Sequence, residues 1–149
     1  MAVSKFLDPK NDIAFKKIFG SEKNKDILIH FINDIMGFKD GDLIKDVSFL
    51  SPVQDPEIAY KKQSAVDVLC EAEDGTKIIV EMQVAPFKGF EKRAQYYAAK
   101  AYSRQLAQGQ GEDGLYANLK EVIFIAISEY KIFPKKLEYI SHHVILDKN

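Results

Sequence analysis

Residues 66–84, with the sequence VDVLCEAEDGTKIIVEMQV, decide the fold of this protein. Two apolar runs flank the turn-forming residues 73–75, a pattern that predicts an antiparallel β-hairpin. The same runs contain Asp67 and Glu81, both at the end of the hairpin away from the turn. Two carboxylates in so apolar a hairpin require an explanation.

The length of the turn sets how the two strands pair. A two-residue turn would mix the apolar and polar faces of the hairpin, so the hydrophobic pattern rejects it. A three-residue loop that ends at Gly75, in the left-handed conformation, keeps the apolar faces together. This register pairs Glu71 with Lys77 and, further from the turn, places Asp67 directly opposite Glu81.

Two carboxylates directly opposite each other repel, because cross-strand Cβ atoms are roughly 4.5–5.5 Å apart. Either one carboxylate holds a proton, or a divalent cation bridges both. The alternative is that Asp67 and Glu81 lie on a solvated face, where polar residues are ordinary. Leu69 and Ile79 share that face, which favours a partly covered site.

The N-terminal third predicts two helices and a strand. The first helix begins at Pro9, is capped by Asp8 and ends at a left-handed Gly20. The second runs from a cap at Ser21 to Gly37, and residues 46–53 form the strand.

The remaining sequence predicts a crossover helix and further strands. After a loop at 54–63 and the hairpin, an alanine-rich helix covers residues 90–108 and a loop follows at 109–114. The apolar run 121–127 predicts a strand covered on both faces, and residues 142–148 form another strand. The order α-α-β-β-β-α-β predicts an α/β fold, a mixed sheet flanked by helices.

Composition places the chain among single-domain globular proteins, with residues 1–149 as one domain. The chain ends directly after an apolar stretch, so we expect it to be the N-terminal part of a longer protein. No apolar run approaches the ~20 residues of a membrane helix. A single cysteine, Cys70, and no secretory signal predict a cytoplasmic protein, and a net charge of −1 leaves nucleic-acid binding to a local patch.

Four ordered blocks of sequence carry a family resemblance. They are FLDPKNDIAFKKIFGSEKNKDILIHFIN, VDVLCEAEDGTKIIVEMQV, GFEKRAQYYAAKAYSRQL and VIFIAI. Together they resemble the PD-(D/E)xK nuclease family transposases, also called recombination-promoting nucleases, over roughly residues 6–147. The resemblance implies a restriction-endonuclease-like core and Mg²⁺-dependent cleavage of DNA phosphodiesters, with Mn²⁺ as a substitute metal.

The resemblance also assigns roles to residues of the hairpin. Asp67 matches the aspartate of the motif, Glu81 its second acid and Gln83 the position usually held by lysine. It implies that Asp67 and Glu81 hold the metal, with the Met82 carbonyl as a further ligand, and that Gln83 positions the attacking water. Val66 replaces the proline of the motif name, which is a common variation.

Glutamine at position 83 leaves two functions open, because its amide can orient a water but cannot supply a positive charge. In an active endodeoxyribonuclease linked to recombination or mobile elements, that charge comes from the metal, a second metal, Lys16 or Lys100. In the alternative, the domain has lost catalysis and binds DNA or a protein. DNA is the expected partner in the first case, and a homodimer stays open.

Two further groups of charged residues are candidates for the site. Arg93, Lys100 and Arg104 share one face of the predicted helix and are candidates for binding DNA phosphates; the alternative is a solvated face. Asp12 is a candidate additional acid or a first-turn acid that complements the helix dipole, and we favour the latter. The packed stripe expected opposite the basic face is Phe90, Ala94, Ala98, Ala101 and Tyr102.

Overall fold

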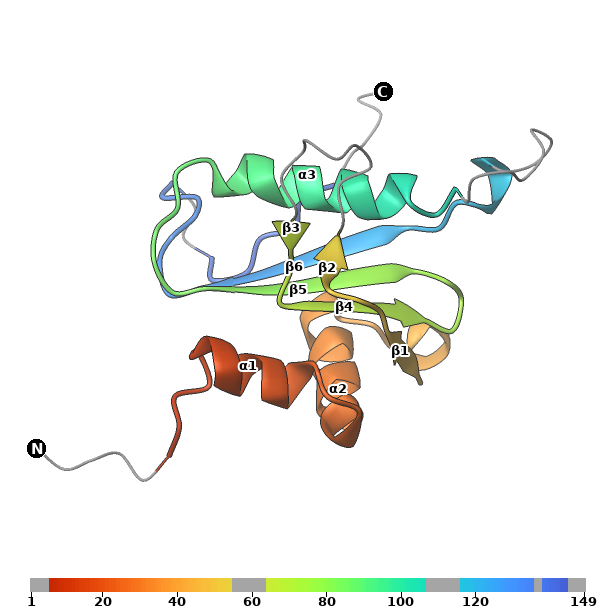
Figure 1. The fold of residues 1–149 in the computed structure, drawn as a ribbon, viewed down its shortest axis with the longest axis horizontal. Coiled ribbons are helices and arrows are strands. Elements are labelled where there is room, and N and C mark those ends of the chain that lie inside the picture. Colours follow the sequence, from red (N-terminus) through yellow and green to blue (C-terminus); the bar gives the residue numbers. More distant parts are fainter. Residues whose placement is uncertain (1–5, 55–63, 107–115, 136–137, 145–149) are drawn as a thin grey trace, which may run out of the picture.

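The protein is a three-layer α/β structure, seen edge-on to its sheet in the computed structural model of Figure 1. The structure describes residues 6–54, 64–106, 116–135 and 138–144. A four-stranded sheet lies between helix α3 on one face and helices α1 and α2 on the other (Figure 1). The expected mixed sheet flanked by helices is confirmed.

Helix α1 spans Asp12–Phe19, and its ends differ from the prediction. Asn11, not Asp8, is the N-cap: its side-chain oxygen accepts hydrogen bonds from the amides of Ile13 and Ala14. Asp8 instead closes the preceding turn, where it accepts from the Lys10 amide at 3.0 Å. The prediction was wrong because Asp8 and Asn11 have the same capping chemistry and only the backbone path separates them.

Gly20 ends α1 without the expected left-handed conformation, since its φ is −112°. A side chain at this position would place its Cβ 2.8 Å from the Lys16 carbonyl oxygen, so close packing against the last turn of the helix requires glycine here.

Helix α2 spans Lys25–Met36 and ends at Gly37 as predicted, where a φ of 67° is left-handed. A short 3₁₀ turn, Glu22–Asn24, precedes it, so the helix begins later than predicted. The Ser21 hydroxyl does not cap this helix and donates to the Lys17 carbonyl of α1 instead.

The main sheet has the strand order β1-β4-β5-β6. Its strands are Val47–Phe49 (β1), Val68–Ala72 (β4), Lys77–Gln83 (β5) and Val122–Ser128 (β6). The β1–β4 and β4–β5 pairs are antiparallel and the β5–β6 pair is parallel, so the sheet is mixed. Val53–Gln54 (β2) and Ser64–Ala65 (β3) form a separate two-stranded ladder, so the strand predicted at 46–53 is divided.

The register of the β4–β5 hairpin is confirmed. Val68 pairs with Val80, and Glu71 pairs with Lys77, whose side chains form a salt bridge. Gly75 has a φ of 91°, and its amide donates to the Ala72 carbonyl to close the three-residue loop. Because side chains alternate along a strand, this register fixes which residues of the hairpin face each layer.

The helix α3, Phe90–Ser103, connects the parallel strands β5 and β6 and covers one face of the sheet. It ends before the predicted Gln108: the Gln105 side chain accepts from the Lys120 amide and donates to its carbonyl, joining the end of α3 to the approach of β6. The loop expected at 109–114 and most of the one at 54–63 lie outside the described residues.

Two apolar clusters lie on opposite faces of the sheet. The larger one packs α1 and α2 against β4, β5 and β6, and it contains the fully buried Cys70, as expected. The smaller one includes Leu69, Ile79 and Ala101 of α3. Asp67 and Glu81 fall on the side of this smaller cluster by strand alternation.

The C-terminal part of the sheet is less covered than predicted. In β6, Ile123 and Ile125 are buried, but Ala126 is exposed, so the strand is not covered on both faces along its whole length. Residues 142–144 form no strand, and the rest of the segment predicted at 142–148 lies outside the described residues. No helix in the described ranges is long and apolar enough to cross a membrane.

Candidate active site

The two hairpin carboxylates lie at the open end of the β4–β5 hairpin. Glu81 belongs to the central strand β5, between β4 and β6, and only 4% of its surface is exposed. Asp67 lies in the bend just before β4, and its side chain is 17% exposed. The last paired residues are Val68 and Val80, so Asp67 and Glu81 occupy the next register position, one step beyond the ladder.

The Asp67 carboxylate is held by two donors. One oxygen, Oδ2, accepts a hydrogen bond from the Met82 amide at 2.9 Å. The other, Oδ1, lies 3.6 Å from the Lys16 ammonium, which itself lies 2.7 Å from Asp12. The strand β5 and the helix α1 therefore fix the orientation of Asp67.

The Glu81 carboxyl has a strongly raised pKa. Burial is the largest cause, and the charge of Asp67 and a hydrogen bond with it add to the shift, which brings the pKa of Glu81 to about 8. The charges of Arg93 and Lys16 oppose the shift. Near neutral pH one proton is thus shared within the pair, which is one of the two ways of offsetting the repulsion that the sequence indicates.

The residue pair Met82-Gln83 completes this end of the hairpin. The Met82 amide binds Asp67, and the Met82 carbonyl accepts a hydrogen bond from the Gln83 side-chain amide at 3.1 Å. Gln83 is half-buried, beside the end of the parallel β5–β6 pair. The structure therefore brings Asp67, Glu81 and Gln83 into one neighbourhood.

Of the three basic residues predicted to share one face of this helix, Arg93 and Lys100 are at least partly buried, whereas Arg104 is exposed. Lys100 is only 8% exposed and Arg93 is half-buried, whereas Tyr102, expected in the packed stripe, is 45% exposed. The other four residues of the predicted stripe, Phe90, Ala94, Ala98 and Ala101, are buried or half-buried, so the stripe is confirmed except at Tyr102. Long basic side chains also pack their methylene groups while keeping a polar tip.

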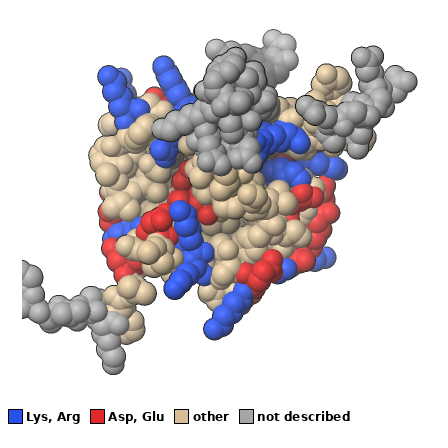
Figure 2. Space-filling view, viewed as in Figure 1, with Lys and Arg blue, Asp and Glu red and all other residues tan. Residues whose placement is uncertain are grey.

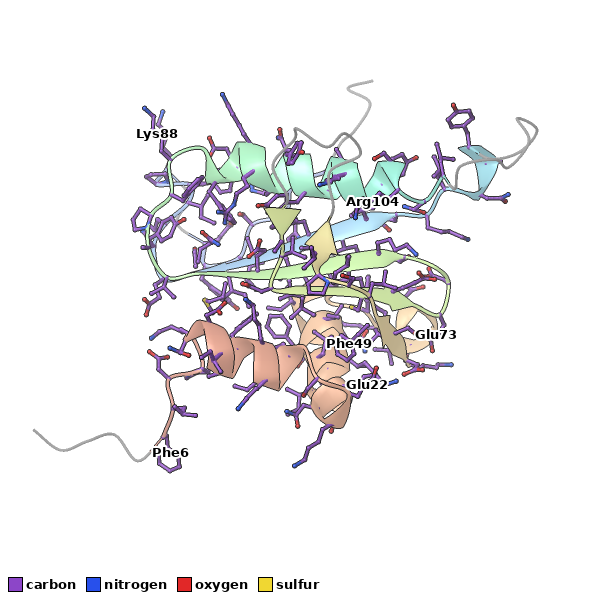
Figure 3. The ribbon with its side chains drawn as sticks, in the orientation of Figure 1. Phe6, Glu22, Phe49, Glu73, Lys88 and Arg104 are labelled. Carbon is purple, nitrogen blue, oxygen red and sulfur yellow. The ribbon has the colours of Figure 1, made fainter. Side chains whose placement is uncertain are left out.

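Arg93 and Arg104 lie near opposite ends of α3. Arg93 lies in the first turns of α3 and interacts electrostatically with Glu81. Arg104 follows the C-terminal end of α3, whereas Lys88 lies before its N-terminal end (Figure 3). It lines a hollow of about 410 Å³ together with Glu71 and Lys77, at the turn end of the hairpin. Of these two residues, Arg93 is the one next to the carboxylate pair.

The surroundings of Arg93 were not expected from the sequence. Its guanidinium carbon lies 4.6, 5.1 and 5.8 Å from the ring centroids of Phe87, Phe90 and Tyr97. The spacing of Arg93 from Phe90 and Tyr97, three residues after one and four before the other, is a signal that could have indicated this stack.

Asp12 lies in the first turn of α1, is exposed, and forms an i,i+4 pair with Lys16. It reaches the carboxylate pair only through Lys16, which suits the first-turn position favoured from the sequence. A salt bridge of 2.6 Å between Lys10 and Glu129, unexpected from the sequence, joins the start of the chain to the residue after β6.

The donor atoms at this site suit a hard divalent cation. Two carboxylates and the Met82 carbonyl offer only oxygen, which Mg²⁺ prefers while it keeps several waters. No group of three or more His, Cys, Asp and Glu side chains that could hold a metal occurs within the described ranges. A metal here would thus depend on the carboxylate pair and a backbone oxygen, and it would replace the proton that the pair shares.

The charge on the visible surface is mixed. Figure 2 shows Lys and Arg side chains interspersed with Asp and Glu over the described part of this face, rather than one continuous basic patch. This agrees with the net charge of −1 and makes the few cations next to the carboxylates important for binding an anion.

A family model for PD-(D/E)XK nuclease family transposases matches residues 9–149, nearly the whole chain. The chain belongs to this family. No curated protein and no solved structure matches it. Membership supports a nuclease-type activity, and nucleases of the PD-(D/E)XK type generally use divalent metals.

Proposed function

We propose that this protein is a divalent-metal-dependent endodeoxyribonuclease that serves recombination or mobile elements. The observation that supports this proposal most is the nearly buried Glu81, which lies beside Asp67 on a central strand of the sheet in a member of this family. A buried pair of acids costs stability, so its presence at the end of an apolar hairpin indicates a functional role.

Asp67, Glu81 and the Met82 carbonyl would hold the cation, with Mg²⁺ as the expected metal and Mn²⁺ as a substitute. A cation bound there would polarise a DNA phosphate and lower the pKa of an attacking water. In the hydrolysis, the water oxygen bonds to phosphorus, one P–O bond to a deoxyribose oxygen breaks, and the proton of the water ends on that leaving oxygen.

Groups of this protein would orient the metal-binding carboxylate, the attacking water and the DNA backbone. The Met82 amide fixes Asp67, so its second oxygen has a defined direction. Gln83 can turn its amide from the Met82 carbonyl to the attacking water, a movement of one side chain. Lys16 holds the outer side of Asp67 at the surface, where it is 46% exposed and accessible to a DNA backbone.

Nicking of supercoiled plasmid DNA tests the proposal. The wild type should nick with Mg²⁺ or Mn²⁺ and not with a chelator, and Glu81→Ala should not nick under either condition. Lys92→Gln is a matched control, because Lys92 is exposed on α3 and its substitution also removes one charge. Equal nicking by the wild type and Glu81→Ala would contradict the proposal.

A second function is supported by Gln83, which lacks the charge of the lysine usual at this position. In this function the domain has lost catalysis and binds DNA or a protein. The same assay separates the two: absence of nicking at every Mg²⁺ and Mn²⁺ concentration, together with salt-sensitive DNA binding, would favour the binding module.

A further inference from the structure

Arg93 occupies an unusual environment for a surface-helix arginine. Three aromatic rings surround its guanidinium within 5.8 Å, and Phe90, one of the three, also packs edge-on against Phe124 of β6. Stacking on aromatic faces suits the planar, weakly hydrated guanidinium and restricts its movement. The cation is therefore preorganised between α3 and the sheet.

At least one donor of Arg93 has no partner among the described residues. Its Nε is buried without a hydrogen-bond partner, and no carboxylate of the described residues lies within salt-bridge distance of it. A buried donor without an acceptor costs free energy, and such a cost at a site indicates a ligand that supplies the acceptor.

The other nearby cation differs from Arg93 in this respect. Lys16 already lies 2.7 Å from Asp12 and 3.6 Å from Asp67, so carboxylates neutralise its charge. Arg93 acts on Glu81 electrostatically while remaining outside salt-bridge distance, which leaves its donors for an incoming anion.

We propose that Arg93 is a catalytic residue of this site: its guanidinium binds the scissile phosphate of the DNA and supplies the positive charge that Gln83 cannot. This inference rests on the proposed nuclease function. Phosphate oxygens suit the guanidinium because its donors form a planar fork that matches two oxygens at once. The positive charge at the site would then come from helix α3, which covers the sheet, instead of from a lysine at position 83 of strand β5.

The test is a rescue experiment with four proteins: wild type, Arg93→Gln, Gln83→Lys and the double variant. Arg93→Gln should lower the nicking rate by about 10²–10³-fold, the usual cost of removing one fixed donor to the reacting group. Adding Gln83→Lys should restore at least tenfold in the Arg93→Gln background, because the lysine returns the missing charge. A loss that Gln83→Lys does not relieve would overturn the proposal.

DNA binding in a chelator gives a second readout that needs no metal and no catalysis. By fluorescence anisotropy with a labelled duplex, Arg93→Gln should reduce the slope of log affinity against log salt by about 1, and the double variant should restore it. Lys92→Gln serves as the charge-matched control for α3 in both assays. An unchanged slope in Arg93→Gln would overturn the phosphate contact.

Thermal melting of all variants separates loss of the aromatic stack from loss of charge. Arg93→Lys keeps the charge and loses the planar fork of donors, so it should retain the salt slope of the wild type with slower nicking.

If the wild type nicks no faster than Glu81→Ala, the proposed nuclease function is wrong. The salt slope of DNA binding then tests the phosphate contact of Arg93 separately.

Discussion

The two ends of the β4–β5 hairpin carry charged pairs of opposite character in one continuous register. At the turn end, Glu71 and Lys77 form a salt bridge, with side chains 37% and 18% exposed. At the open end, Asp67 and Glu81 have the same sign, and Glu81 is nearly buried. The charged pair at the turn end therefore stabilises the hairpin, whereas the pair of like charges at the open end destabilises it.

This difference teaches which pair is structural and which is functional. Opposite charges across strands contribute roughly 0.2–1 kcal/mol, a modest gain that any hairpin can use. Like charges in a buried position reduce stability, and folding alone gives no reason to keep them. The predictions below test this contrast, beginning with the largest expected effect.

Removing the acid at the open end should abolish activity, whereas removing the acid at the turn end should leave it nearly unchanged. Glu81→Ala should reduce metal-dependent plasmid nicking to the background without protein, whereas Glu71→Ala should leave the rate within about threefold, because it touches only the turn end. The measurement is the initial nicking rate with Mg²⁺. Equal losses in the two variants would mean that general destabilisation, rather than the site, controls the rate.

The pH dependence of stability should come from the open end. The folded-state pKa of Glu81 is raised to about 8 from 4.5, so the folded protein binds this proton more tightly than the unfolded chain. Its contribution to stability is complete below the unfolded pKa and is lost as the pH rises through about 8. In a chelator at pH 9, Glu81→Gln should therefore be more stable than the wild type by on the order of 5 kcal/mol, at about 1.4 kcal/mol for each unit of pKa difference.

Thermal melting from pH 4 to pH 9 measures this effect. The curves of the wild type and Glu81→Gln should separate only above the ordinary glutamate pKa of 4.5. Mg²⁺ or Mn²⁺ should raise the melting temperature of the wild type at high pH and have little effect on the variant. Parallel curves over the whole range would show that Glu81 ionises without cost, contrary to its burial.

Gln83→Lys makes the open end resemble the turn end by adding a cation beside an acid. If metal charge carries catalysis, this substitution in the otherwise unchanged protein should retain the nicking rate or raise it, by up to about tenfold. The matched control is Gln83→Met, which cannot orient a water and should be slower. A lysine variant as slow as the methionine variant would show that the amide itself is needed.

The smallest effect belongs to the turn end. A double-mutant cycle with Glu71→Gln and Lys77→Gln should give a coupling of about 0.2–1 kcal/mol from urea unfolding, because the pair is only partly buried. The coupling should fall at high salt. A coupling above about 2 kcal/mol would place this pair in the same class as buried charge networks and weaken the contrast between the two ends.

Particular residues show how far prediction from the sequence reached. The loop closed by Gly75 and the Glu71–Lys77 pair were predicted, because turn chemistry and strand alternation are local rules. The N-cap of α1 was missed, since Asp8 and Asn11 both suit the position. The burial of Lys100 beside Ala101 on the inward side of α3 was missed, because a hydrophobic pattern does not anticipate a buried lysine there.

By itself the sequence determined the hairpin register and, with it, the neighbourhood of Asp67 and Glu81, since a period of two residues leaves no freedom once the turn is known. Tertiary structure alone decided that Glu81 is nearly buried and that Arg93 lies among three rings near it. The physical reason is rotation. A helix can turn about its axis until its side chains fit the surface below, so the face of α3 that meets the sheet depends on packing with distant strands.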